Sequence, residues 1–413
     1  MTAATSLLDH LDHAFGATPP NRLAIAISGG GDSTALLHLA VQWAKADLVA
    51  VTVDHGLRPE AAQEAEEVAR LCGALGVPHE ILRWGGWDSH GNLQDAARRA
   101  RYSLISDWAR GCGIGAVALG HTSDDNAETF IMGVSRGAGL DGLSGMRPQF
   151  SRDGVRFHRP LLAAARADLR DYLRDRGARW IEDPSNEDLR FDRIKARKAL
   201  AALAEAGVTP DALTGTIANL NATRRDVNRE LMALVQGDLS FDRGDVLIGV
   251  DRFLSLSPEY ARRLLNTCLR LVSGQDYPPR AEKVMRLIDE ASRGIAATLH
   301  GCQITTRVSD PARAIRIARE PAAVAHLSAP TKAVWDHRWV LDGPHGPDLE
   351  IRALGADGLK SCPEWRSTGL PRASLAASPA IWKGARLVAA PLAGLQNGWT
   401  ATLLHGKNSF NPL

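Results

Sequence analysis

The 413-residue chain lacks three features that would assign it to a special class of protein. Its five cysteines are tens of residues apart and form no C-x-x-C pair, which argues against zinc ribbons, cluster sites and a disulfide framework. No apolar run approaches the roughly 18–20 residues that a membrane helix needs. The formal net charge is only +2, so bulk charge does not identify the partner. We therefore expect a cytoplasmic globular protein of two or three domains with no membrane contact.

The first 180 residues alternate between short apolar runs and helix-like stretches. Four strands are predicted, at 23–27, 48–53, 79–84 and 116–120, and helices at 33–45, 60–75, 92–110 and 124–134. Unbroken apolar strands between helices of this length are typical of a parallel sheet that is covered on both faces. Ligands bind such sheets at the carboxyl ends of the strands, so the loops that follow the strands are the first candidates for a site.

The alternation weakens after Gly177. Residues 181–205 are charged and helix-like, and the stretch of about 210–295 has apolar residues spaced by three and four, which predicts mostly helix. Beyond Gln303, short β-like runs lie between Pro and Gly turns. We predict an α/β domain with a doubly wound parallel sheet (1–205), a helical domain (206–300) and a small β-rich C-terminal domain (301–413).

A glycine-rich turn follows the first predicted strand and opens the first helix of the alternating region. Its residues are Ser28, Gly29, Gly30, Gly31, Asp32 and Ser33. Glycines let backbone N–H groups approach an anion, the helix N-terminus adds favourable partial charge, and the serine hydroxyls can donate to phosphate oxygens. The loop has no lysine and fits neither the Walker pattern nor G-x-G-x-x-G. The alternative is a plain turn in which Asp32 or Ser33 caps the helix.

Polar residues also follow the second and fourth strands. Asp54, His55 and Arg58 lie just past the second strand, where a ribose or base would bind in a doubly wound sheet, although a simple strand-end turn is the alternative. Asp125 and Glu128 follow the fourth strand and are three residues apart on a predicted helix, so they share a face. Two carboxylates there suit Mg²⁺ or an ammonium group. The same spacing also fits a helix capping box.

A basic helix is predicted after D-P-S-N (183–186). Arg190, Arg193 and Arg197 fall on one helical face. Such a row usually means a solvated helix face, but it could also neutralise triphosphate charge or hold an RNA backbone.

Taken together and in this order, these segments resemble one family. S-G-G-x-D-S (28–33) resembles the pyrophosphate loop of the N-type ATP pyrophosphatases, known as PP-loop proteins. The segments V-D-H-G-L-R (53–58), G-H-T-S-D-D-N-A-E-T (120–129), R-P-L-L (159–162) and D-P-S-N resemble the tRNA(Ile)-lysidine synthetases in particular, as do 92–102 and 136–146. The motif-bearing match covers roughly residues 20–200, and the rest of the chain resembles the longer members only loosely.

The resemblance implies an enzyme that uses ATP and Mg²⁺ to adenylate the wobble cytidine of an isoleucine tRNA with a CAU anticodon. The ε-amine of L-lysine then attacks C2 and expels AMP, which leaves lysidine. By the same resemblance, Ser28 to Ser33 hold the phosphates, and Asp54 and His55 lie near the adenosine. Asp32 holds Mg²⁺, with Asp125 as a second candidate ligand, or helps to activate the lysine.

The resemblance also makes 1–205 the catalytic domain and 206–300 the tRNA-binding domain, and it implies roles for four further residues. Asp125 and Glu128 recognise the lysine ammonium or the metal, and Arg193 and Arg197 stabilise phosphate charge or contact the RNA. A homodimer is expected. One departure is visible: the family commonly has Arg-Asn-x-x-Arg after D-P-S-N, whereas here Ile194 follows Arg193.

Three rival functions were weighed against this prediction. A tRNA thiolation enzyme of the same superfamily would need paired or cluster-binding cysteines, which the scattered cysteines disfavour. A small-molecule amide ligase would leave the helical and β-rich parts unexplained. A non-catalytic RNA- or nucleotide-binding relative is expected to lose its acidic residues before its glycines, yet Asp32, Asp125 and Glu128 are all present.

Overall fold

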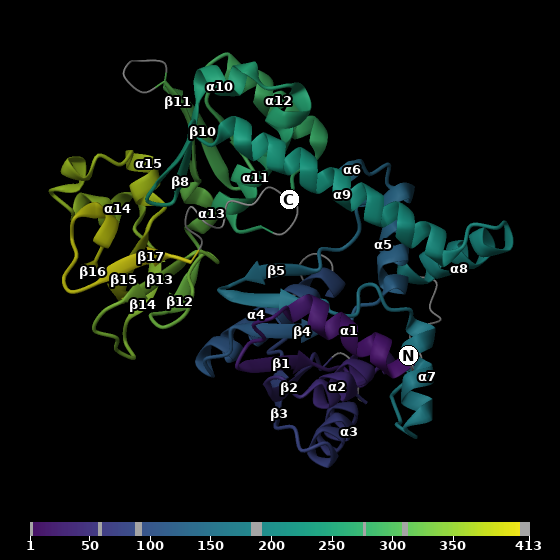
Figure 1. Cartoon of the computed structure of the whole chain (residues 1–413). Helices are drawn as coiled ribbons and strands as arrows, with labels where there is room; N and C mark the ends of the chain where they lie inside the picture. Colours follow the sequence, from purple (N-terminus) through teal and green to yellow (C-terminus); the bar gives the residue numbers. More distant parts are fainter. Residues whose placement is uncertain are drawn as a thin grey trace. The chain divides into compact units, whose positions relative to one another are not determined.

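The computed structural model of the chain describes residues 3–56, 60–86, 93–182, 192–275, 278–307 and 313–404 (Figure 1). The chain divides into two compact units, Met1–Arg224 and Arg225–Leu413. The division into three parts at 205/206 and 300/301 stays a prediction. Among the described residues, no helix combines the length and the apolar character needed to cross a membrane.

The first unit alternates strands and helices as the sequence predicts. Its elements, in chain order, are α1 (Ala3–Phe15), β1 (Arg22–Ala26), α2 (Gly31–Trp43), β2 (Asp47–Asp54), α3 (Ala61–Ala74), β3 (His79–Arg83), α4 (Leu93–Gly111), β4 (Ala116–Leu119), α5 (Ser123–Ser135), α6 (Leu140–Leu143), β5 (Gln149–Arg152), β6 (Val155–His158), α7 (Arg166–Asp175), α8 (Asp192–Glu205) and the first part of α9 (Pro210–Val235). All four predicted strands are present within two residues of their expected ends.

These strands form one six-stranded sheet in the order β3-β2-β1-β4-β6-β5. Neighbouring strands from β3 to β6 are parallel, and β5 pairs antiparallel with β6 at the edge. The chain moves outward from β1 to β3 and then crosses back to β4 on the other side of β1. The strand order therefore reverses between β1 and β4, and their carboxyl ends flank the place where such sheets bind ligands.

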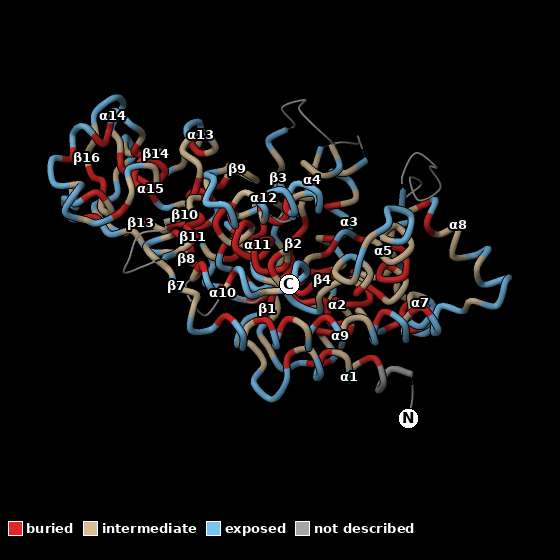
Figure 2. Tube along the Cα trace, turned by 90° about the horizontal axis from the view of Figure 1, so that it is seen from above, coloured by how far each residue is buried: buried red, intermediate tan, exposed pale blue. Residues whose placement is uncertain are grey.

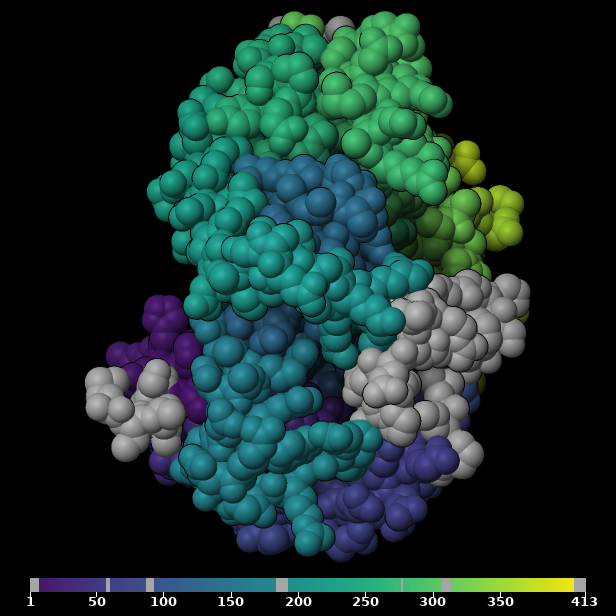
Figure 3. Space-filling view, turned by 90° about the vertical axis from the view of Figure 1, so that its right-hand side faces the viewer, coloured from purple at the N-terminus to yellow at the C-terminus, as the bar shows by residue number. Residues whose placement is uncertain are grey.

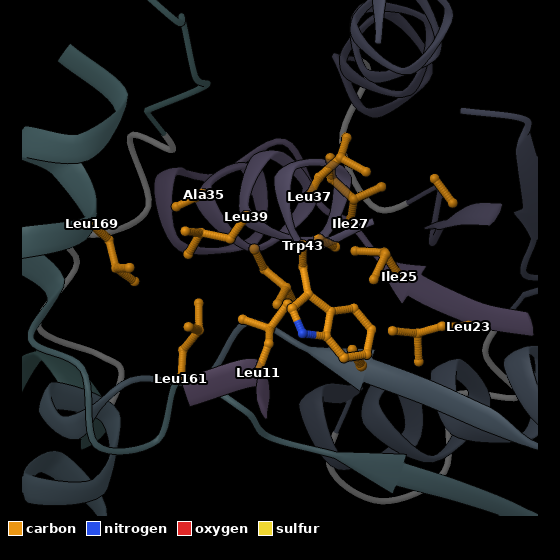
Figure 4. Packing of buried hydrophobic residues seen from close by; sticks show 14 of the residues in the cluster. Leu11, Leu23, Ile25, Ile27, Ala35, Leu37, Leu39, Trp43, Leu161 and Leu169 are labelled. Carbon is orange, nitrogen blue, oxygen red and sulfur yellow. The ribbon is translucent and has the colours of Figure 1, made fainter. Parts of the chain in front are cut away.

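Both faces of the sheet are covered, which confirms the doubly wound α/β prediction. Leu23 and Ile25 of β1 point into a core built with α1, α2 and α7, and Figure 4 shows them against Trp43 and Leu39 of α2. Ala24, between them, belongs to the core of the opposite face with residues of α4. Successive side chains of a strand alternate in direction, so a strand buried on both sides must be apolar throughout. Buried residues accordingly dominate α2 and β4 in Figure 2.

The second unit combines helices with small antiparallel sheets. Its elements are the end of α9, β7 (Leu239–Asp242), β8 (Asp245–Gly249), α10 (Val250–Ser255), α11 (Pro258–Ser273), α12 (Ala281–Ser292), β9 (Ala297–Leu299), β10 (Cys302–Arg307), β11 (Ala314–Arg319), α13 (Pro321–Val324), β12 (Ser328–Pro330), β13 (Trp339–Asp342), β14 (Glu350–Ala353), α14 (Gly355–Lys360), η2 (Trp365–Thr368), α15 (Arg372–Ala376), β15 (Pro379–Lys383), β16 (Arg386–Ala389), η3 (Pro391–Ala393) and β17 (Thr400–Leu403).

The stretch predicted as mostly helical contains a hairpin as well as helices. β7 and β8 join β11, β10 and β9 in a five-stranded sheet, so one sheet combines strands from both sides of residue 300. α11 has a strongly amphipathic sequence, and its Leu264, Leu265 and Leu269 are buried in the core that this sheet shares. The β-rich end is as expected: β12, β14, β15 and β16 form a second sheet, and β13 pairs with β17.

Candidate active site

The glycine loop adopts a conformation at Gly29 that few other residues could adopt. Gly29 has a φ of +84°, in the left-handed region. A Cβ atom added there would lie 2.5 Å from Cδ1 of Ile181, whose backbone N–H donates to the Gly29 carbonyl at 2.9 Å. Gly120, after β4, also has no room for a side chain, because an added Cβ would lie 2.8 Å from Cα of Ser33. The ends of β1 and β4 are thus brought into close contact at the start of α2.

Neither Asp32 nor Ser33 caps α2, so the capping alternative is wrong for both. The N-cap is Gly30, and no side chain accepts a hydrogen bond from the first turn there. Ser33 Oγ instead donates to the Gly30 carbonyl at 3.0 Å and accepts from the Ser28 N–H at 3.2 Å, while the Ser28 and Ser33 hydroxyls are 3.2 Å apart. An uncapped helix N-terminus preceded by glycines and hydroxyls is a suitable binding place for phosphate oxygens.

The three predicted acids meet at one arginine. Arg166, the first residue of α7, donates from Nε to Asp32 Oδ2 at 3.0 Å, from Nη2 to Asp125 Oδ1 at 3.2 Å and from Nη1 to Glu128 Oε1 at 3.3 Å. Asp32 comes from the first turn of α2, whereas Asp125 and Glu128 come from α5. The fold therefore joins the loop after β1 to the helix after β4, and Arg166 is what connects them.

Asp125 has a second task at the start of α5. Thr122 is the N-cap, and its backbone N–H donates to Asp125 Oδ2 at 2.9 Å, which completes a capping box. The sequence-based alternative had Asp125 and Glu128 as the two ends of such a box, whereas the structure has it one turn earlier. Each carboxylate oxygen of Asp125 thus serves a different role: Oδ2 fixes the helix start and Oδ1 binds Arg166.

The basic helix predicted after D-P-S-N begins in the described residues as α8, and two of its arginines reach the acids. Arg197 Nε donates to Glu128 Oε1 at 2.7 Å. Nη1 of Arg193 is 4.0 Å from Asp125 Oδ1, and the Arg193 side chain is 42% exposed. Ile194, which stands where the family commonly has Asn, is buried. Arg190 and the D-P-S-N turn lie outside the described residues, as does Arg58. In the space-filling view, α7 and α8 lie at the surface of this unit (Figure 3).

Asp54 and His55 lie at the end of β2, next to β1, and none of their described contacts reaches the acid cluster. Asp54 Oδ1 accepts the N–H of Gly56 at 2.8 Å, which is the strand-end turn of the alternative interpretation. His55 Nε2 is 3.4 Å from the guanidinium of Arg101, and its ring meets Trp84 edge-on with centroids 5.7 Å apart. Their expected role beside an adenosine stays a prediction.

The pKa values of the two aspartates in the cluster are shifted in opposite directions. Burial raises the pKa of Asp32, and the nearby Arg166 offsets only part of that rise. Burial acts in the same direction on Asp125, but Arg166 and the Thr122 N–H outweigh it, so the pKa of Asp125 is below its ordinary value. Burial, with Arg159 close by, lowers the pKa of His121 to about 3, so this histidine is neutral at physiological pH. Arg166 itself has a raised pKa because its three carboxylates outweigh its burial.

Sequence reasoning missed Arg166, and with it the centre of the site. One signal was available: an arginine in the first turn of a helix is opposed by the helix dipole, so a specific partner is needed to hold it there. Asp124 supplies part of that support, since its carboxylate accepts the backbone N–H of Arg166 at 2.8 Å. Arg166 also lies only four residues beyond the R-P-L-L segment.

The carboxylates of the site can be compared with the ligands that Mg²⁺ prefers in proteins. Among the described residues, no group of three or more His, Cys, Asp or Glu side chains is arranged as a metal site. Mg²⁺ commonly takes only one or two carboxylates and completes its coordination with water and substrate phosphates. Asp32 fits that pattern, because only its Oδ2 is bound to Arg166 and it lies beside the glycine loop.

Comparison with known proteins defines the class first. Residues 3–204 match the PP-loop domain family, the class that the glycine loop and the sheet order also indicate. This family uses ATP. The whole chain is 49% identical over 410 residues to the tRNA(Ile)-lysidine synthase of Ruegeria pomeroyi, covering 98% of this chain and 97% of that protein. The chain belongs to the tRNA(Ile)-lysidine synthase family.

Other similarities are more partial. The tRNA(Ile)-lysidine synthase of Rhodopseudomonas palustris is 42% identical over 285 residues, covering 66% of this chain and 81% of that protein. Among solved structures, the U34-tRNA thiolase NcsA from Methanococcus maripaludis matches with a TM-score of 0.47 and 15% identity, covering 53% of this chain and 80% of that one. Family membership therefore rests on the curated relatives, not on the solved structures.

Proposed function

We propose that the chain ligates L-lysine to C2 of the wobble cytidine of an isoleucine tRNA with a CAU anticodon, with conversion of ATP to AMP and pyrophosphate. One observation carries the proposal: the acid cluster of Asp32, Asp125 and Glu128 is assembled on Arg166 directly beside an uncapped glycine loop. A phosphate-binding loop and a cation-binding acid cluster side by side suit a reaction between a nucleotide and an amine. The identity to whole-length lysidine synthases supports the choice of substrates.

The first step activates the cytidine. Its C2 oxygen attacks the α-phosphate of ATP, the bond to the β-phosphate oxygen breaks, and pyrophosphate leaves. The N–H groups of residues 29–33 and the hydroxyls of Ser28 and Ser33 bind the phosphates, and Asp54 and His55 border the adenosine. Mg²⁺, held by Asp32 with Asp125 as a second candidate ligand, would neutralise charge on the departing pyrophosphate.

The second step forms the new C–N bond. Asp125 and Glu128 bind the lysine ammonium, which must lose a proton before its nitrogen attacks C2 and AMP departs. Glu128 has one carboxylate oxygen, Oε2, that is buried and has no hydrogen-bond partner among the described residues. A buried acceptor of this kind requires a donor, and an ammonium N–H is a suitable one. A carboxylate of the cluster takes up that proton.

The arginines of α8 and the second unit complete the proposal. Arg193 and Arg197 stabilise developing phosphate charge or contact the RNA, and the second unit binds the tRNA. Among its basic residues, Arg225, Arg280 and Lys283 are exposed and suit phosphate contacts, whereas Arg263 is buried against Glu259 and Asn228. We expect a homodimer.

The thiolation alternative is not favoured by any described feature. The five cysteines are free, and only Cys72 and Cys112 belong to the first unit. Cys72 is buried and Cys112 is exposed. Burial raises the pKa of Cys72 to about 11, which makes it a poor nucleophile for sulfur transfer.

A direct assay tests the proposal. The chain is incubated with ATP, Mg²⁺, labelled lysine and a tRNA transcript with the CAU anticodon of isoleucine, and label in the tRNA is counted. We expect incorporation that depends on ATP and stops when the wobble cytidine is replaced by uridine. No incorporation, together with sulfur transfer to the same tRNA from a sulfur donor, would overturn the proposal.

A further inference from the structure

Arg166 stands where a cation of the reaction would stand. Its guanidinium is 17% exposed and touches three carboxylates from two helices at 3.0, 3.2 and 3.3 Å. Five N–H donors in a fixed fork let a guanidinium bridge several carboxylates at once, which an ammonium group cannot do with the same geometry. The backbone of Arg166 is also fixed, because the carboxylate of Asp124 accepts its N–H. Arg166 therefore links the glycine loop to α5 through its side chain.

The charges of the cluster do not balance within its core. Three carboxylates share Arg166 and Arg197, while Arg193 approaches only to 4.0 Å from a half-exposed position. Glu128 is 1% exposed and its Oε2 has no hydrogen-bond partner among the described residues. A buried carboxylate oxygen without a partner is costly. The site is built to accept one further positive donor.

We propose that Arg166 is a positioning residue for the ligation, which rests on the function proposed above. In the ligand-free protein it neutralises Asp32, Asp125 and Glu128 and keeps them within one site. When a substrate ammonium enters, it binds beside Arg166 and takes over part of the carboxylate contacts. Arg166 thus holds the acceptor geometry ready, and at the same time competes with the cation that the site must bind.

This dual role predicts an unusual kinetic signature. Removal of the guanidinium misplaces the acids relative to the loop, so turnover falls, because even small misplacements reduce rates by about 100-fold. Removal of a competing cation does not weaken, and should tighten, binding of the substrate ammonium.

The experiment compares Arg166→Gln and Arg166→Lys with wild type in labelled-lysine incorporation as a function of lysine concentration. For Arg166→Gln we expect kcat to fall about 100-fold or more and KM for lysine to stay equal or fall. Arg166→Lys keeps the charge without the fork, and should restore kcat by about tenfold over Arg166→Gln. Arg174→Gln is the matched control: it removes the same charge about two turns along α7 from a position that is 60% exposed and paired with exposed Asp171, and should change kcat by less than about twofold.

Thermal unfolding supplies a readout that does not depend on activity. Arg166→Gln should lower Tm by about 5 °C or more, and adding Asp32→Asn to it should restore part of that loss, because one unpaired carboxylate is removed. Additive losses, or a raised KM for lysine with kcat unchanged, would overturn the role of Arg166. If wild type incorporates no lysine while the Tm pattern holds, the proposed function fails and the bridging role of Arg166 stands.

Discussion

Each unit of the chain contains a buried ion cluster, and the two clusters differ in what they leave unsatisfied. In the second unit, Asp336 lies between Arg319 and Arg338 and accepts from Arg319 Nε at 2.9 Å and from Arg338 Nη2 at 3.2 Å. The remaining donors of the two arginines bind the carbonyls of Gly301 and Gly244. No buried side-chain atom of these three residues lacks a hydrogen-bond partner. We call this group of residues the closed cluster because its buried polar atoms all have partners.

The cluster of Asp32, Asp125 and Glu128 in the first unit contains a buried oxygen without a partner among the described residues, and we call it the open cluster. Acids exceed the arginines that touch them closely, Glu128 retains an unpartnered oxygen, and neutral His121 has an unpartnered Nδ1 among the described residues. Buried polar groups in native proteins are nearly always satisfied, so exceptions point to a ligand or a catalytic role. The contrast teaches that burial and ion pairing alone do not identify a site; what distinguishes the first cluster is an unpartnered carboxylate oxygen within a group of three acids beside the glycine loop.

The largest expected effect concerns the closed cluster. Asp336→Ala leaves Arg319 and Arg338 buried without their shared carboxylate, so we expect a loss of about 3–5 kcal/mol in free energy of unfolding. Denaturant unfolding followed by circular dichroism measures it. Lys360→Ala, which removes an exposed ion pair with Asp357 in the same unit, is the control and should cost less than about 1 kcal/mol. Similar losses for the two variants would contradict the structural role of Asp336.

In the open cluster, a substitution should reduce activity strongly and stability only slightly. Asp125→Asn keeps an acceptor for the Thr122 N–H but removes the charge that faces Arg166, so lysine incorporation should fall about 100-fold or more. Stability should change by only about 1–2 kcal/mol, the size of a weakened cap. Activity near wild type would show that Asp125 serves the capping box alone.

Acid should affect stability through His121. Its folded pKa of about 3 lies below the unfolded value near 6.5, so its neutral burial contributes stability above pH 6.5 that is lost as the pH falls toward 3. His55 and His158, whose pKa values burial lowers to about 4, also take up protons on unfolding in this range, so His121 accounts for about one proton of the total between pH 6 and pH 4. His121→Gln should reduce the proton uptake by that one proton, which unfolding curves at several pH values would reveal. An unchanged pH slope in the variant would contradict the assignment.

The smallest effect on activity is expected for Arg193, at the exposed edge of the open cluster. Arg193 is half-exposed and 4.0 Å from Asp125, whereas Arg197 is 2.7 Å from buried Glu128. Arg193→Gln should thus reduce incorporation by less than about tenfold, and Arg197→Gln by more. Equal losses would show that Arg193 acts on the substrate and not through Asp125.

The sequence was sufficient for four of the strands and for the acids. Apolar runs at 23–27, 48–53 and 116–120 between helices are typical of parallel strands buried on both faces, and the carboxyl ends of such strands lie along one edge. That reasoning brought Asp32 and Asp125 together before any coordinates. It confirmed neither their division of roles nor those of Asp54 and His55, which stay predictions.

What the sequence did not reveal depends on contacts between distant segments. Arg166 reaches the acids because α7 starts beside α5, a distance of 41 residues from Asp125 that no periodicity encodes. The hairpin of β5 and β6 was also missed, although Asp153 and Gly154 between its strands both have positive φ, as an Asp-Gly hairpin turn requires. The hairpin of β7 and β8 was overlooked too, although Arg243 and Gly244 between its strands both have positive φ.

The most direct measurement compares the two clusters in one assay. Single-turnover transfer of labelled lysine to saturating tRNA is followed for Asp125→Asn and Asp336→Asn at a temperature where both are folded. The account predicts a loss of about 100-fold or more for Asp125→Asn and less than about fivefold for Asp336→Asn. Equal rates for the two variants, or full activity of Asp125→Asn, would contradict the claim that the open cluster of the first unit performs the chemistry.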